Sequence, residues 1–270
     1  KKKIFVISDH PMAPSGVGTQ TKYMIHALLK TGRYKFICFG GAMQHDKYEP
    51  QNITGEDWED GDWTVYPVDG YGSAEMVRSL LWTEKPDMLW FMTDPRFYGW
   101  LWQIENEVRA NLPMVYYHVW DNFPYPKYNK KHYDSNDVVV SISKVTHNIV
   151  DFVAPEVENY YLPHGVDSEI FKKLDEQELS SLKEQNFGEN EDKFTFFWNN
   201  RNARRKQTGS LALWFGEFAE EVGADNVRLI MHTDPKDQHG QDLHVLLKDH
   251  GFADGRIVIS DQKVPPEHLA

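Results

Sequence analysis

The sequence of 270 residues has a single cysteine, Cys38, and no apolar run long enough to cross a lipid bilayer. One cysteine cannot form an internal disulfide, which is typical of a protein from a reducing compartment. The opening residues Lys1–Lys3 lead directly into a short apolar run, which is not the pattern of a secretory signal peptide. These absences together predict a cytoplasmic protein without a transmembrane segment.

A surplus of basic residues is also missing, because 29 Lys and Arg face 41 Asp and Glu, for a net charge of -12. Nucleic-acid-binding proteins normally present a basic surface, so this charge argues against nucleic acid as a general partner. It also disfavours a general binder of membrane surfaces, although a peripheral membrane contact and the oligomeric state stay open. Hydrophobic residues, at 40%, are sufficient to fill the cores of one large or two medium domains.

Short apolar runs alternate with amphipathic stretches along the chain. The apolar runs, brief and rich in β-branched and aromatic residues, predict strands at residues 4–8, 35–39, 64–67, 88–92, 114–118, 138–142 and 160–162. The amphipathic stretches predict helices at residues 19–30, 73–83, 97–110 and 144–153. Apolar strands that alternate with helices form parallel sheets covered on both faces, so we expect a doubly wound α/β fold.

A polar, charged segment, residues 172–193, interrupts this alternation, and its stretch 175–186 is itself predicted to be helical. The alternation then restarts with strands at 194–198, 227–231 and 257–259 and helices at 209–222 and 242–249. We therefore expect two α/β domains, residues 1–167 and 168–270. The strands of the second domain make only part of a doubly wound sheet, which has about six. This domain is therefore expected to be incomplete, with VPPEHLA (264–270) opening another helix.

A cationic loop lies between the strand predicted at 194–198, which we expect to be buried, and the helix predicted at 209–222. It holds four cations within six residues: Arg201, Arg204, Arg205 and Lys206. The first backbone N–H groups of a helix are unpaired and its dipole is positive there, so an anion is stabilised at this point. The loop therefore predicts a bound phosphate, and the alternative interpretation is a solvated basic turn.

The first predicted strand also leads into a loop with Gly16 and Gly18, just before a helix. Glycines allow the backbone to approach a ligand closely. The complete G-x-G-x-x-G fingerprint of dinucleotide-binding proteins is absent, because residue 21 is Thr. A phosphate-binding loop and a tight strand–helix turn are both consistent with this pattern.

His118 and Asp121 lie where the strand predicted at 114–118 ends, at the carboxyl edge where ligands bind in open α/β sheets. We expect His118 to act at a reaction centre and, as a strand-end polar group, to contribute little to core packing. The alternatives are a histidine satisfied by the backbone and an aspartate that caps the turn. The His and acidic residues show no tight metal-ligand spacing, so no metal is expected, and a G-x-S-x-G nucleophile elbow is absent.

Taken in order, these features resemble glycosyltransferase family 4, whose members are retaining, nucleotide-sugar-dependent enzymes with the GT-B fold. The interdomain motif LPHGVDSEIF (162–171) is the most specific landmark, and Arg201 and Lys206 match the family's G-R-x-x-x-x-K element. The other landmarks are PSGVGTQ (14–20), YYHVWD (116–121), NDVVVSISKVTHNIV (136–150) and VPPEHLA (264–270). The resemblance covers the whole chain and implies two Rossmann-like domains that face a cleft.

The chain departs from the family pattern at three positions. His164 replaces the usual Asn of the interdomain motif, Ser15 a frequent second Gly, and Asn200 the Gly before Arg201. The family's E-x7-E motif, which holds the donor sugar and ribose, would lie beyond residue 270. These departures concern the fine contacts to the donor.

The resemblance implies transfer of a hexose from a UDP- or GDP-linked sugar to an acceptor with retention of the anomeric configuration, and no separate cofactor. Arg201 and Lys206, faced by the amides near Gly16 and Gly18, would stabilise the leaving diphosphate. His118 would position the donor sugar or the acceptor. The acceptor, a carbohydrate, lipid or other small molecule, would bind the first domain. Contacts to the acceptor or the sugar are expected from Asp94, Arg96, Trp120, Asp121 and His164.

Two other functions stay open on this sequence. One is another GT-B enzyme, such as a sugar-nucleotide epimerase or a phosphorylase, and a phosphorylase would need a pyridoxal-binding lysine. The other is a catalytically silent sugar- or nucleotide-binding module. Product formation separates an enzyme from a binding module. The sequence identifies neither the sugar, the nucleotide nor the acceptor.

Overall fold

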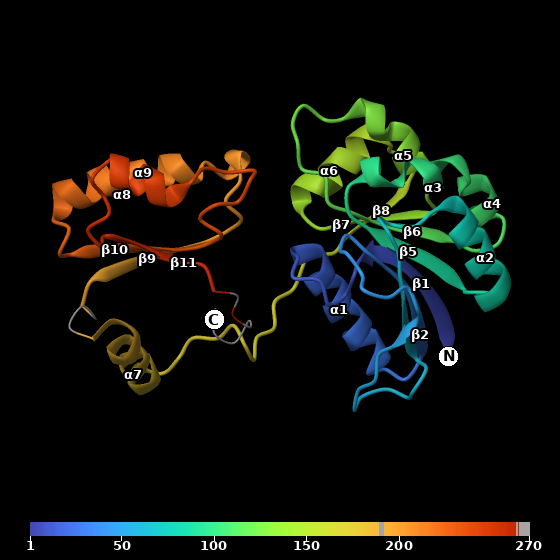
Figure 1. The fold of residues 1–270 in the computed structure, drawn as a ribbon. Coiled ribbons are helices and arrows are strands. Elements are labelled where there is room, and N and C mark those ends of the chain that lie inside the picture. Colours follow the sequence, from blue (N-terminus) through green and yellow to red (C-terminus); the bar gives the residue numbers. More distant parts are fainter. Residues whose placement is uncertain (189–191, 263, 265–270) are drawn as a thin grey trace. The chain divides into compact units, whose positions relative to one another are not determined.

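The computed structural model describes residues 1–188, 192–262 and 264. The chain forms two compact units, Lys1–Gly165 and Val166–Ala270, a division two residues before the expected boundary. Each unit is a largely parallel sheet with helices packed on it, which confirms the predicted α/β class (Figure 1). Among the described residues, no helix is long and apolar enough to span a membrane.

The first unit contains a sheet of eight strands in the order β3-β4-β2-β1-β5-β6-β7-β8. Its strands are β1 (Lys2–Asp9), β2 (Tyr34–Gly41), β3 (Gln51–Asn52), β4 (Trp63–Pro67), β5 (Met88–Met92), β6 (Met114–His118), β7 (Val138–Ser141) and β8 (Glu158–Tyr161). All pairs are parallel except that of β4 with the short β3, which was not predicted. The chain order reverses between β1 and β5. At such a reversal a ligand crevice is expected outside the carboxyl ends of the strands.

Helices cover both faces of this sheet, α1 on one and α2 to α6 on the other (Figure 1). They are α1 (Gly16–Leu29), α2 (Ala74–Glu84), α3 (Gly99–Gln103), α4 (Glu105–Arg109), α5 (Lys130–Asp134) and α6 (Lys144–Val153), with 3₁₀ turns η1 (Pro95–Tyr98) and η2 (Lys127–Asn129). Ser15, Ser73 and Ser143 cap α1, α2 and α6 with their hydroxyl groups. The single helix expected at 97–110 is wrong. Between α3 and α4 the backbone of Ile104 leaves the helical region (φ -113°), and its side chain is buried in the core.

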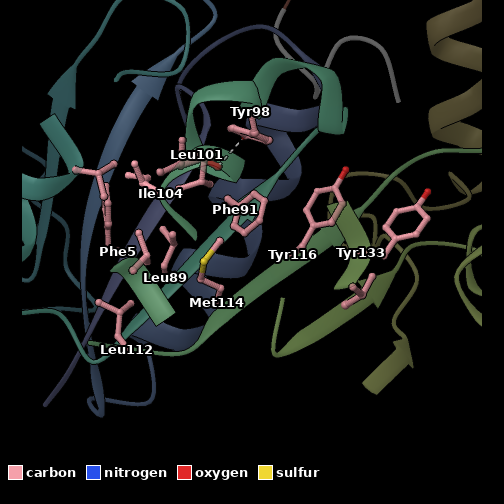
Figure 2. Packing of buried hydrophobic residues seen from close by; sticks show 14 of the residues in the cluster. Phe5, Leu89, Phe91, Tyr98, Leu101, Ile104, Leu112, Met114, Tyr116 and Tyr133 are labelled. Atoms are coloured by element: carbon pink, nitrogen blue, oxygen red, sulfur yellow. Dashed lines mark hydrogen bonds between the residues drawn. The ribbon is translucent and has the colours of Figure 1, made fainter. Parts of the chain in front are cut away.

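Two apolar clusters hold these helices to the sheet, one on each face. The larger contains Phe91 of β5 and Tyr116 of β6, whose rings stack with centroids 4.9 Å apart (Figure 2). The buried hydroxyl of Tyr98 donates a hydrogen bond to the carbonyl of Ile7 in β1 at 3.1 Å. Large aromatic side chains therefore form a packed base beneath the edge at which β1, β5 and β6 end.

The described part of the second unit has the strands β9 (Phe194–Asn199), β10 (Val227–His232) and β11 (Ile257–Ser260), all parallel and in the order β11-β10-β9. Helices α8 (Thr208–Val222) and α9 (Leu243–Asp249) pack on this sheet, and α7 (Glu176–Phe187) precedes it. The prediction that the strand at 194–198 is buried is wrong. Because β9 is an edge strand here, Phe194 and Phe197 are 67% and 53% exposed. The helix expected at 264–270 lies, apart from residue 264, outside the described residues.

Candidate functional site

A hydrogen-bond network joins the carboxyl end of β1 to the loop that follows it. Asp9, the last residue of β1, is buried, and its two carboxylate oxygens accept hydrogen bonds from the Ser15 hydroxyl at 2.6 Å and the Tyr71 hydroxyl at 2.8 Å. Burial, and then the nearby Asp9 carboxylate, raise the pKa of Tyr71, which keeps this phenol a donor at neutral pH. Sequence reasoning missed Asp9 and Tyr71, although a carboxylate at the end of an apolar strand, as at Asp9, could have indicated a site.

Gly16 and Gly18, expected in the loop before the helix, lie in the first turn of α1 and differ in what surrounds them. A Cβ atom on Gly18 would lie 2.7 Å from the carbonyl oxygen of His10, so the fold of this loop requires glycine there. A Cβ atom on Gly16 would have no atom within 4 Å. Ser15 accepts a hydrogen bond from the Gly18 backbone at 3.0 Å. Packing therefore explains why residue 18 is glycine, and the proposed contacts of Gly16 and Gly18 with a diphosphate stay predictions.

Thr93, directly after β5, has an unusual backbone conformation. Its φ angle is +106°, a region that β-branched residues avoid, and the residue is buried. Its carbonyl accepts a hydrogen bond from the Tyr116 hydroxyl at 2.6 Å, which helps to hold this conformation. Strain of this kind costs roughly 1–3 kcal/mol and is concentrated at functional sites. Thr93 lies next to the reversal of strand order between β1 and β5, and no feature of the sequence indicates its backbone conformation.

Asp94, Arg96 and Trp120, all selected from the sequence, lie together above the ends of β5 and β6. The Arg96 guanidinium donates two hydrogen bonds to the Asp94 carboxylate, at 2.9 and 2.7 Å. It also lies over the Trp120 ring, 5.2 Å from the centroid. Asp94 in addition caps η1 by accepting from the Arg96 backbone. The charge of Arg96 is therefore compensated locally, and the ring of Trp120 supports the guanidinium.

His118, the last residue of β6, is completely buried, with 0% of its surface exposed. The expectation that it contributes little to core packing is therefore wrong. Its ring lies edge-on to that of Tyr133, and Nε2 is 2.9 Å from the Tyr133 hydroxyl. Burial lowers the pKa of His118 to about 3, a shift that nearby Asp94 and the Thr146 backbone oppose only weakly. Nothing in the described part of the chain reaches hydrogen-bonding geometry at Nδ1.

Asp121 and His164, the other two residues expected to contact sugar or acceptor, are exposed. The ring of His164 lies 5.5 Å from that of Tyr117, the residue before His118 in β6. The structure therefore keeps both side chains at the surface of the first unit, and their contact with a ligand stays a prediction.

In the second unit, the amino end of α8 is open. The residue before the helix, Gln207, has a left-handed backbone (φ 50°), and its side chain does not cap the first turn. The buried hydroxyl of Thr208, at the first helical position, has no hydrogen-bond partner among the described residues. A hollow of about 400 Å³ adjoins this end, lined by Asn202, Ala203, Arg204, Gln207, Thr208, Ser210, Gly240 and Gln241. Unpaired N–H groups, a positive dipole and cations suit an anion here.

The two cations matched to the G-R-x-x-x-x-K element differ in their contacts. The Arg201 guanidinium donates from Nε to Asp237 at 2.6 Å and from Nη2 to the same carboxylate at 3.2 Å. Nη2 also lies 2.8 Å from Nδ1 of His239. Lys206, in the 3₁₀ turn η4 (Arg204–Lys206), makes no salt bridge to any described residue. Sequence reasoning found both cations but missed Asp237, which lies 36 positions away.

Across residues 1–188, 192–262 and 264, no group of three or more His, Cys, Asp and Glu side chains is arranged to hold a metal ion.

Comparison with known proteins identifies the fold. No family model matches the sequence. No curated protein matches it either. Solved structures do match: trehalose-6-phosphate synthase from Burkholderia multivorans has a TM-score of 0.66 at 14% identity, with 100% of this chain and 74% of that chain covered. A trehalose-6-phosphate protein from E. coli, bound with UDP-2-fluoro glucose, gives 0.64 at 11% identity and covers 99% and 75%.

A glycosyltransferase from Rickettsia africae matches as well, with a TM-score of 0.62 at 12% identity, over 97% of this chain and 69% of that chain. Similarity at such low identity reports on the fold and not on the substrate. The chain therefore has the architecture of GT-B proteins, as predicted.

Proposed function

We propose that this chain belongs to a glycosyltransferase that moves a hexose from a nucleoside diphosphate sugar to an acceptor with retention of configuration, as in glycosyltransferase family 4. The observation that carries the proposal is the open amino end of α8, which directly follows the loop that carries Arg201 and Lys206 and adjoins a hollow lined by Arg204. The fold adds support, since the E. coli relative was solved with UDP-2-fluoro glucose.

The chemistry requires cations at this point. Transfer breaks the bond between the anomeric carbon and the diphosphate oxygen, and negative charge develops on the leaving diphosphate. Arg201 would donate a planar fork of N–H groups to it and Lys206 a compact ammonium, while the first N–H groups of α8 add positive potential. The acceptor oxygen then bonds to the anomeric carbon, and its proton passes to the diphosphate on the same face of the sugar.

The first unit would bind the acceptor at the reversal between β1 and β5. Here the strained Thr93, the carboxylates of Asp9 and Asp94 and the supported Arg96 surround one strand edge. Hydroxyl groups of a carbohydrate are suited to carboxylate acceptors of this kind. The family resemblance implies that His118 positions the donor sugar or the acceptor. Because its side chain is completely buried, it would do so indirectly, by holding Tyr133 and the end of β6 in place.

The test is a transfer assay with UDP- and GDP-linked hexoses and a panel of carbohydrate acceptors, read by NMR at the anomeric centre. The proposal predicts a glycoside product with the donor's anomeric configuration. Binding of nucleoside diphosphate without any product would instead support a catalytically silent binding module. A product of inverted configuration would exclude the retaining mechanism.

A further inference from the structure

The loop that follows β10 is fastened to the cationic loop that follows β9. Asn202, which is buried, donates a hydrogen bond to the Gln241 carbonyl at 2.7 Å and accepts one from its backbone N–H at 3.4 Å. The backbone of Arg204 donates to the carbonyl of His239 at 3.0 Å. A Cβ atom on Gly240 would lie 2.4 Å from the Asn202 carbonyl oxygen, so the two backbones are in close contact. The second loop is therefore a fixed support for the first.

Asp237 is the group through which this support reaches Arg201. Its carboxylate is only 11% exposed, and the backbone N–H of His239 fixes its orientation by donating to Oδ1 at 2.9 Å. It binds the guanidinium along the Nε–Nη2 edge, and hydrogen bonding to Arg201 and His239 holds the pKa of this carboxyl well below its usual range. Within the described residues, Nη1 of Arg201 has no partner.

We propose that Asp237 is a positioning residue for the donor diphosphate, holding Arg201 so that its Nη1 edge is presented to the phosphate oxygens. This inference rests on the proposed function. An exposed arginine that is already ordered loses less side-chain entropy when it binds an anion. Geometry favours support over competition, because Asp237 and His239 contact only Nε and Nη2 and leave Nη1 accessible.

The experiment compares Asp237→Asn with Asp234→Asn. Asp234 is a matched control: it lies on the same loop, and its carboxylate accepts from the backbone two residues ahead at 2.9 Å, as that of Asp237 does. The probes are UDP, and GDP in parallel, against uridine and guanosine, which lack the diphosphate. Asp237→Asn should weaken diphosphate binding about tenfold, as expected when the partner behind a ligating group is removed. Nucleoside binding, the melting temperature and the control variant should stay unchanged.

A second pair of variants tests whether Asp237 acts on the diphosphate through Arg201. In the Arg201→Ala background, Asp237→Asn should cause no further loss of diphosphate affinity, because the two residues act as one unit. Tighter binding by Asp237→Asn would show competition, and equal losses for nucleotide and nucleoside would show a general structural role. Either result overturns the inference while leaving the proposed function intact. A wild-type protein that binds neither UDP nor GDP would overturn both.

Discussion

At the scale of single residues, the position of His118 has consequences for stability. The ring is enclosed between the aromatic side chains of Tyr116 and Tyr133, and its Nε2 is paired with the Tyr133 hydroxyl. A side chain in such a place supports the end of β6 from within. Effects of its removal on activity therefore cannot be separated from effects on the fold unless stability is measured as well.

Replacing His118 by Ala should lower the free energy of unfolding by about 2–4 kcal/mol, since it leaves a cavity and removes the His118 partner of the Tyr133 hydroxyl. Tyr133→Phe, which removes only the hydroxyl and its hydrogen bonds to His118 and Asn129, should cost about 1 kcal/mol. Urea unfolding at pH 7.5 measures both. A loss below that of Tyr133→Phe would mean that the ring is not packed as described.

The depressed pKa of His118 also predicts how stability changes with pH. The imidazole stays neutral in the folded state down to a pKa of about 3, whereas in the unfolded chain it takes up a proton near pH 6.5. Unfolding therefore binds protons between these values, and the stability present above pH 6.5 is lost as the pH falls towards 3. From pH 7.5 to 5.5 this one group should remove about 1.4 kcal/mol.

The comparison that isolates this effect uses His118→Asn. The lowered pKa values of His10, His26, His132 and His164 act in the same direction, so the pH dependence of stability in the wild-type protein is expected to be the sum of these effects. Urea unfolding of both proteins across pH 5.5–7.5 should give a shallower pH dependence in the variant. Identical slopes of unfolding free energy against pH in the two proteins would show that the pKa of His118 is not lowered by folding.

At the scale of elements, the connection from β1 to α1 combines the buried carboxylate of Asp9, the Ser15 cap and two glycines in the first turn of α1 that differ in their surroundings. Gly18→Ala should destabilise the protein by about 1–3 kcal/mol, the range for overpacking, because the new methyl group meets the His10 carbonyl. Gly16→Ala is the matched control and should change stability by no more than about 0.5 kcal/mol, because its site is open. Thermal unfolding compares them, and equal losses would contradict this packing.

Elements defined by local pattern were predictable. The bounds of β5, β6 and α6 agree with the prediction because an apolar run or an amphipathic period is a local property. The exposure of β9 was not predictable, since an aromatic run does not reveal whether its strand lies at an edge. The break at Ile104 and the left-handed Thr93 likewise depend on packing against distant residues. The partners of Arg201 and Asp9 were missed for the same reason.

At the scale of the whole molecule, two α/β units with the architecture of GT-B proteins each contribute one candidate binding edge. The first unit offers carboxylates and a strained backbone at a reversal of strand order, which suits an uncharged hydroxyl-bearing acceptor. The second offers cations and an open helix end, which suits a diphosphate. This division of chemistry between the units agrees with the proposed transfer of a sugar from a nucleoside diphosphate.

The central claim is that the loop before α8 binds the diphosphate of a sugar nucleotide. Calorimetric titration of UDP and GDP into the wild-type protein, Arg201→Ala and Lys206→Ala tests it most directly. We expect saturable binding of at least one nucleotide, weakened about tenfold or more in each variant by loss of a charge-assisted hydrogen bond. Absence of binding to the wild-type protein, or equal affinity in all three proteins, would contradict it.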